Sequence, residues 1–139
     1  MNFDLERFVD AQNPVYAQAC RELRQGRKQG HWMWFIFPQL KGLGQSSMAN
    51  QFGIAGADEA RAYLAHPVLG PRLEECTSLV NGVEGVSVDD LFGYPDDMKF
   101  RSSMTLFANV SSGNNVFAGA LKKYFAGHPD PLTLEMLSG

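Results

Sequence analysis

The hydrophobic positions of the chain are most concentrated in one short run, Trp32–Phe37, which contains both tryptophans of the sequence. No face of this run is polar, so it must be buried nearly all round whether it is helical or extended. Because each large aromatic side chain buries roughly 150–250 Å², we expect the other segments to pack around it. The polar residues at its ends, His31 and Gln39, are then held wherever this core places them.

Intrinsic propensity alone favours a strand for Trp32–Phe37. No second run of comparable length has strand character, and a lone strand has no partner with which to pair. We therefore predict a buried helix that is stopped by Pro38, because proline does not continue a helix.

In the rest of the chain, apolar residues recur at steps of three and four positions, which is typical of helices. Asparagine, serine and aspartate side chains punctuate this pattern as N-caps. The predicted caps are Asn2, Asn13 followed by Pro14, Asp58, Ser87 with Asp90, Asn115, and Asp130 followed by Pro131. The predicted helices span approximately 3–9, 14–25, 32–37, 59–65, 67–80, 88–92, 97–108, 116–126 and 131–137, and 39–50 is predicted to be a loop. The prediction is an all-α fold in which a single domain, 1–139, forms an irregular multi-helix array around a buried aromatic segment.

The composition is that of a soluble globular protein, with 139 residues, 45% hydrophobic and 19% charged. The net charge of −3 argues against binding to nucleic acid or to an anionic membrane, since both favour a basic surplus. The chain start lacks a basic region followed by a long apolar run, and no run approaches the roughly 20 residues that span a bilayer. We expect a cytoplasmic protein without a membrane partner.

The two cysteines, Cys20 and Cys76, lie far apart and match no CxxC spacing. This spacing supports neither a disulfide framework nor a zinc site. The three histidines also lack metal-binding spacing. We predict no metal and no cofactor, and we expect Cys20 to be a small core residue.

His31 is the first candidate for chemistry. Beside two tryptophans its imidazole would be partly desolvated, and this favours the neutral form that can act as a base. The alternative is a histidine that only starts a helix and bonds to backbone. The other two histidines, His66 and His128, each precede a proline and are predicted to be turn or cap residues.

The second candidate is the loop that contains Gly42, Gly44, Ser46 and Ser47. Glycines let successive backbone N–H groups point into a concavity, and serine hydroxyls add donors, so the loop can hold a phosphate or carboxylate. The pattern lacks the third glycine of a dinucleotide fingerprint and the GK[ST] of a P-loop. A plain surface loop is the alternative.

The third candidate is the run from Asp96 to Ser103. On a helix Asp97 and Arg101 are i, i+4 neighbours that can pair. In the functional interpretation, Lys99 and Arg101 clamp an anion while Asp97 handles a proton, and Ser102 lies nearby. In the alternative interpretation this is a solvated helix start with acids near its positive end.

Several stretches together resemble one family. They are His31–Ser46, Tyr63–Leu73, Phe92-Gly93 and Asp96–Phe107. The chain resembles, from Phe8 to about Thr133, the bacterial domain of unknown function 1810 family, which is sometimes mislabelled calpastatin. The resemblance implies a single, mainly helical domain and no established function. A calpain inhibitor of that kind is an extended polar chain, whereas this composition is that of a packed domain.

Helix packing alone does not require the polar residues of these motifs. We hypothesise that the Gln39–Ser47 loop and the Asp97–Ser103 helix start meet beside the aromatic segment and line one pocket. The catalytic candidates are His31 and Asp97. The ligand-binding candidates are Trp32, Trp34, Gln39, Gly42, Gly44, Ser46, Ser47, Lys99, Arg101 and Ser102.

Such a pocket would suit a nucleotide-like or other planar anionic metabolite, bound and, in an enzyme, hydrolysed. The alternative is a non-catalytic protein-interaction module whose motif residues serve only the fold. A pocket with converging, partly exposed polar groups favours binding. Polar groups fully satisfied by internal partners favour the module. The pattern leaves the oligomeric state open.

Overall fold

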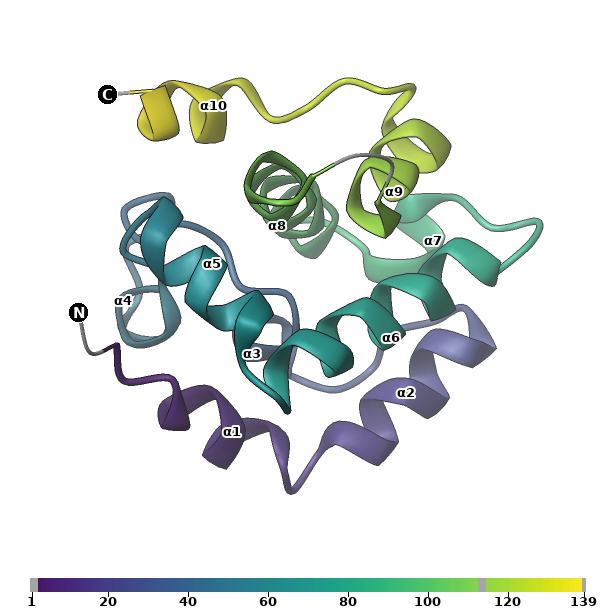
Figure 1. Ribbon diagram of the computed structural model, residues 1–139. Coiled ribbons are helices and arrows are strands. Elements are labelled where there is room, and N and C mark those ends of the chain that lie inside the picture. Colours follow the sequence, from purple (N-terminus) through teal and green to yellow (C-terminus); the bar gives the residue numbers. More distant parts are fainter. Residues whose placement is uncertain (1–2, 113–114, 139) are drawn as a thin grey trace.

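The computed structural model describes residues 3–112 and 115–138, and these residues form ten α-helices (Figure 1). No strand occurs in them, and a single backbone bridge pairs Leu40 with Ile54. The helices are α1 (Glu6–Gln12), α2 (Tyr16–Gln25), α3 (Met33–Ile36), α4 (Ser47–Phe52), α5 (Ala57–Ala65), α6 (Leu69–Gly82), α7 (Val88–Phe92), α8 (Asp96–Val110), α9 (Val116–Phe125) and α10 (Pro131–Ser138). The all-α prediction is confirmed. None of these helices combines the length and apolar character needed to cross a membrane.

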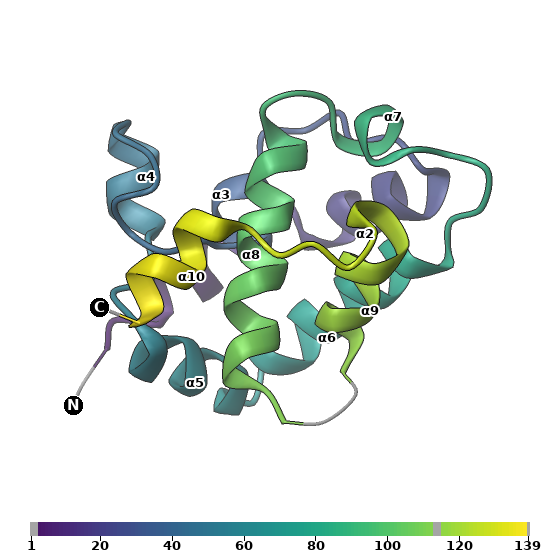
Figure 2. The same ribbon diagram turned by 90° about the horizontal axis from the view of Figure 1, so that it is seen from above.

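Helix α8 lies at the centre of the array and packs against α5, α7, α9 and α10. Helix α6 contacts α2, α5 and α9, so it joins earlier and later helices, as the contact between α5 and α8 also does. Figure 2 shows α10 lying alongside α8, on the same side of it as α4. The segments before α4 and before α10 are therefore carried toward one side of α8.

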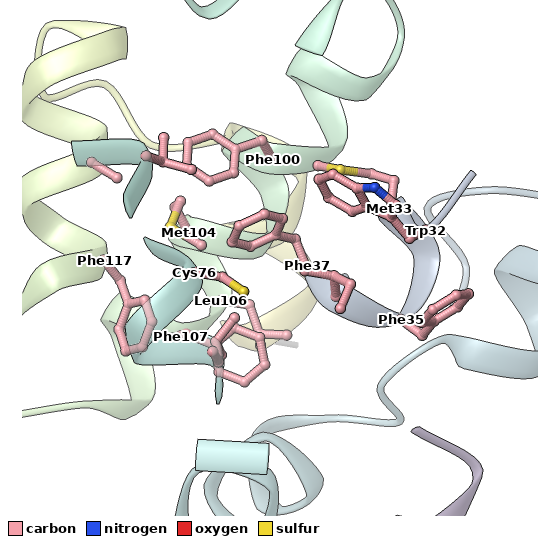
Figure 3. Packing of buried hydrophobic residues seen from close by; sticks show 14 of the residues in the cluster. Trp32, Met33, Phe35, Phe37, Cys76, Phe100, Met104, Leu106, Phe107 and Phe117 are labelled. Atoms are coloured by element: carbon pink, nitrogen blue, oxygen red, sulfur yellow. The ribbon is translucent and has the colours of Figure 1, made fainter. Parts of the chain in front are cut away.

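The predicted aromatic centre is confirmed around Phe37, which is 1% exposed. Its ring lies 5.1 Å from that of Phe100 and 5.9 Å from that of Phe92, both edge-on. Figure 3 shows Phe37 pointing from the end of α3 toward Phe100 and Met104 of α8. Trp34 is the half-buried member of the Trp32–Phe37 run, so one indole of the aromatic centre reaches the surface.

The predicted helix over 32–37 exists, but it is a single turn, Met33–Ile36. Phe37 already leaves helical geometry, with φ −123° and ψ 74°. Pro38 explains this early end, because proline disfavours helical geometry in the residue before it and has no N–H to donate.

Several predicted boundaries were wrong. Asn13 is helical and its N–H bonds to the carbonyl of Val9, so it closes α1 rather than capping α2. Asp58 lies in the first turn of α5, whose N-cap is Gly56. The predicted 39–50 loop ends early, because the Ser46 side chain accepts from Ala49 N and caps α4. The predicted cap Asn2 lies outside the described residues.

Other local predictions were right. Ser87 and Asp90 form the reciprocal capping box at α7, and the Asn115 side chain accepts from the backbone N–H of Ala118 at α9. Before α6, His66 Nδ1 accepts from two backbone N–H groups, as expected of a cap residue. In each of these cases the bonded residues lie within four positions of each other, so the local sequence pattern is enough to predict the bond.

A buried carboxylate fixes the approach to the aromatic run. Glu22 Oε1 accepts from Gln29 N at 2.7 Å, from Gly30 N at 2.8 Å and from the indole Nε1 of Trp32 at 3.0 Å. Burial raises the pKa of Glu22, but these hydrogen bonds and one from Gln18 outweigh it and lower the pKa to about 2. The charged carboxylate thus holds the 29–32 turn against α2.

Candidate functional site

A hollow of about 230 Å³ is lined by the first turns of α8, the loop after α3 and the start of α10. We name it the Trp34 pocket. Its walls are mostly apolar, with a few polar groups of different character among them. The lining residues are Trp34, Gln39, Leu43, Gly44, Pro95, Met98, Lys99, Ser102, Asp130 and Leu132.

The structure brings five of the sequence-predicted residues together in the Trp34 pocket. They are Trp34, Gln39, Gly44, Lys99 and Ser102. The first three come from the aromatic run and the loop that follows it, and the last two come from the first turns of α8. The two polar motifs therefore do lie side by side at the edge of the aromatic centre.

His31 and Trp32 do not line this pocket. Trp32 is 1% exposed, and its indole N–H is bound to Glu22 inside the protein. His31 is exposed, so the expectation of a partly desolvated imidazole was wrong. The 29–32 turn explains both placements: the Trp32 indole points into the protein, where it donates to Glu22, and the His31 side chain lies in solvent.

Asp97 and Arg101 also lie outside the lining. The predicted ion pair between them is not formed: Asp97 Oδ1 accepts from the backbone N–H of Met98 at 2.9 Å. Arg101 instead donates from Nε to the carbonyl of His128 and from Nη2 to that of Pro129, both at 3.0 Å. The predicted two-cation clamp is therefore absent, and Arg101 ties the segment before α10 to α8.

Three small residues of the glycine–serine loop also lie outside the lining. Ser46 caps α4 and Ser47 is its first residue. Gly42 has φ +102°, which glycine adopts readily. Gly44 does line the pocket, and a Cβ there would come within 2.9 Å of the Ala49 Cβ. The loop thus shapes one wall and caps a helix.

Lys99 supplies the positive charge of the pocket. Its Nζ lies 3.8 Å from the centroid of the Trp34 indole and 3.2 Å from Asp96 Oδ1. The side chain is 19% exposed. The other oxygen of Asp96 binds Lys28 Nζ at 2.8 Å. Lys99 is therefore held between an aromatic face and a carboxylate that a second lysine also neutralises.

Asp130 is a pocket residue that the sequence indicated only as a helix start. Its Oδ2 accepts from Ser102 Oγ at 3.2 Å, from Thr133 N at 3.1 Å and from Thr133 Oγ1 at 2.6 Å. Its backbone N–H donates to Thr105 Oγ1 at 2.8 Å. The residue thus caps α10, is fixed to α8, and is one of the residues that line the pocket.

Gln39 is fixed through its backbone rather than its side chain. Its carbonyl accepts from Ile54 N at 2.9 Å, beside the bond from Lys41 N to the Ile54 carbonyl at 2.8 Å. The side-chain amide makes no hydrogen bond with any residue in 3–112 or 115–138. It therefore offers both a donor and an acceptor to the pocket.

The polar groups that reach the pocket are an ammonium, a carboxylate, an amide and a hydroxyl, and no histidine is among the lining residues. Within the described ranges, no group of three or more His, Cys, Asp or Glu side chains is placed to hold a metal ion. This arrangement can orient a small ligand through donors and acceptors of both signs.

Comparison with known proteins places the chain in a family and a fold. The family model described as "Protein of unknown function (DUF1810)" matches residues 2–137. The chain is similar to the crystal structure of the conserved hypothetical protein Rv1873 from Mycobacterium tuberculosis, with 55% identity and a TM-score of 0.97. That similarity covers 99% of this chain and 98% of the other. A search of the curated proteins found no match. The family resemblance inferred from the sequence is thereby confirmed.

Proposed function

The chain belongs to the DUF1810 family, whose function is unknown, and from this premise we propose that the Trp34 pocket binds a small planar metabolite of the nucleobase, nucleoside or nucleoside-monophosphate class. One observation carries the proposal: three segments far apart in sequence bring an indole, an ammonium, a carboxylate and a free amide into one mostly apolar hollow. Ligand sites are typically apolar clefts with a few converging polar groups.

The volume of the hollow limits the size of the ligand that it can enclose. Its volume of about 230 Å³ falls below the roughly 300–1,000 Å³ of pockets for drug-sized ligands. A dinucleotide is too large to be enclosed, whereas a single heterocycle with or without its sugar is of suitable size. The planar indole of Trp34, together with the apolar lining residues Pro95 and Leu132, favours a planar body over a compact, fully polar one.

The charged side chains at and near the pocket limit the charge of the ligand. Lys99 Nζ has three N–H donors, and Asp96 uses one of them. The remaining donors suit one anionic or carbonyl group on the ligand. Arg101 is occupied by two backbone carbonyls, so a polyphosphate would lack the second cation that it requires. We therefore propose a ligand that is either neutral or carries a single phosphate group.

We propose binding and assign no reaction. The acid–base candidates His31 and Asp97 do not line the pocket. Hydrolysis would need Asp130 or another lining group to handle the proton, and Asp130 already accepts three hydrogen bonds as a cap.

The test is a thermal-melting and fluorescence screen against nucleobases, nucleosides and their monophosphates. Ligand at 100 times its dissociation constant stabilises the fold by about 2.7 kcal/mol, which is a rise of several degrees in Tm for a domain of this size. The matched variants are Lys99→Gln, in the pocket, and Lys122→Gln, on the exposed side of α9. The first weakens the binding of monophosphates and the second leaves it unchanged.

The change in tryptophan emission on binding shows whether the ligand lies beside Trp34. In the Trp34→Phe variant only the buried Trp32 remains, and Trp32 does not line the pocket. A ligand that alters emission of the wild type but not of this variant, while still raising the Tm of both, lies beside Trp34. A broad panel without any change in Tm or emission would refute the proposal.

A second candidate function is self-association through the same face. The large apolar side chains that are exposed in the described residues are Tyr94, Met98, Leu132 and Met136, and two of these line the Trp34 pocket. Met98 and Leu132 share the pocket lining, and contiguous exposed apolar patches are typical of interaction surfaces. Light scattering that shows a dimer in the wild type and a monomer in Leu132→Ser would favour this candidate.

A further inference from the structure

We infer that Asp130 determines specificity in the Trp34 pocket by selecting a ligand whose heterocycle presents N–H donors, as amino- and oxopurines do. This inference rests on the proposed function and adds the chemical identity of the ligand edge. It assigns to Asp130 a second role beyond its capping of α10.

The two carboxylate oxygens of Asp130 have unequal surroundings. Oδ2 accepts three hydrogen bonds, from Ser102 and from the backbone and side chain of Thr133. Oδ1 accepts none from the described residues. A charged, half-buried carboxylate oxygen with unused acceptor capacity therefore belongs to a residue that lines the hollow.

The position of that oxygen is fixed before any ligand arrives. The bonds at Oδ2 hold the side chain, and the bond from Asp130 N to Thr105 holds its backbone to α8. Arg101 fixes the two preceding residues through their carbonyls. A preorganised acceptor loses little entropy when a donor binds to it, so it contributes selectively to affinity.

The rest of the lining supplies complementary chemistry. Lys99 offers donors and Gln39 offers a donor and an acceptor, whereas the carboxylate of the lining residue Asp130 can only accept. A ligand N–H at this point forms a charge-assisted hydrogen bond. A heterocycle that presents a ring nitrogen or C–H instead leaves the carboxylate desolvated and unpaired, and this is the costly kind of mismatch.

The experiment compares four ribonucleosides by calorimetry. Guanosine and inosine carry a ring N–H, adenosine carries only an amino group, and nebularine, the unsubstituted purine riboside, carries no N–H on its base. We expect the tightest of the first three to bind the wild type at least ten times more tightly than nebularine. In Asp130→Asn this ratio falls below about threefold, because an amide N–H₂ then replaces the unpaired carboxylate oxygen.

Asp130→Asn retains a side-chain oxygen for Thr133 and Ser102, and asparagine is a good N-cap, so the variant is expected to keep its fold. Its Tm without ligand checks this. The matched control is Asp89→Asn, which removes the same charge from an exposed position of α7. The control keeps the wild-type ratio.

The outcomes separate the two proposals. Purine nucleosides that bind without discrimination against nebularine, or a ratio that is unchanged in Asp130→Asn, overturn this inference and leave the proposed function intact. No binding by any of the four also overturns this inference, whereas the proposed function is refuted only if the broad panel of nucleobases, nucleosides and monophosphates also leaves Tm and emission unchanged.

Discussion

Lys99 Nζ lies 3.8 Å from the centroid of the Trp34 indole, and this contact joins the aromatic run to the first turns of α8. The two residues belong to the two polar motifs that the sequence analysis placed in one pocket. The ammonium also reaches Asp96, so it is held by a ring on one side and a carboxylate on the other. Each partner restricts the side chain to the pocket wall.

The first prediction concerns this contact. A double-mutant cycle with Lys99→Gln and Trp34→Leu is expected to give a coupling energy of about 0.5–1 kcal/mol, because the ammonium–indole pair is only partly desolvated. Urea unfolding of the two single variants and the double variant measures it. The same cycle with Lys122→Gln in place of Lys99→Gln gives no coupling. A zero value for the Lys99 cycle would show that the geometry contributes no stability.

The second prediction concerns Glu22, whose folded-state pKa is depressed to about 2 from an ordinary value of 4.5. A depressed acid pKa stabilises the fold fully above pH 4.5, and this contribution is lost as the pH falls toward 2. One pKa unit corresponds to about 1.36 kcal/mol, so the carboxylate contributes about 3 kcal/mol at neutral pH.

Glu22→Gln is expected to lower the free energy of unfolding at neutral pH by about 3 kcal/mol and to remove this contribution to its dependence on acid pH. Its amide cannot accept at both positions where Glu22 now does, since Gln18 Nε2 donates to the second oxygen at 2.7 Å. Urea unfolding at a series of acid pH values measures both effects. Stability curves of wild type and variant that run parallel between neutral pH and pH 2 would contradict the assignment.

The third prediction contrasts two glycines of α6. A Cβ on Gly70 would come within 2.1 Å of the carbonyl oxygen of Leu64, whereas a Cβ on Gly82 would meet no atom within 4 Å. Gly70→Ala forces α5 and α6 apart and is expected to cost at least about 2 kcal/mol. Gly82→Ala is expected to stabilise by up to about 0.5–1 kcal/mol, because alanine is the better helix former. Melting temperatures of the two variants must move in opposite directions.

The sequence was sufficient where the partners of a residue are its near neighbours. The capping box of Ser87 and Asp90 and the stop at Pro38 are local events, so they were predicted correctly. The two polar motifs were expected to meet because helix packing alone does not require their polar residues, and five of the candidate residues do line one pocket. Exact helix starts were less predictable, since Asn13 fits equally well at the end of α1.

The sequence was insufficient where a long-range partner decides the side-chain direction. Trp32 and Trp34 look alike in the chain, but Trp32 is buried and donates its indole N–H to Glu22, whereas Trp34 is half-buried. Arg101 was predicted to bind an anion. Its actual partners are backbone carbonyls 27 and 28 positions away, and the local sequence does not indicate them. Asp130 was indicated only as a cap, because its place beside the pocket depends on the packing of α10 on α8.

The fourth prediction tests the positioning role of Arg101. Its two bonds to the carbonyls of His128 and Pro129 fix the segment that carries Asp130. Arg101→Met is expected to loosen this segment, so that the Asp130 amide, now bound to Thr105 Oγ1, exchanges its hydrogen at least about ten times faster. Ligand affinity falls too, although Arg101 does not line the pocket.

Hydrogen exchange followed by NMR measures the loosening without a ligand. Arg101→Lys is expected to restore little protection, because a lysine ammonium does not reproduce the planar fork that reaches both carbonyls. Arg21→Met, at an exposed position of α2, is the control and leaves the Asp130 amide unchanged. Wild-type protection of that amide in Arg101→Met would mean that the packing of α10 on α8 holds Asp130 in place by itself.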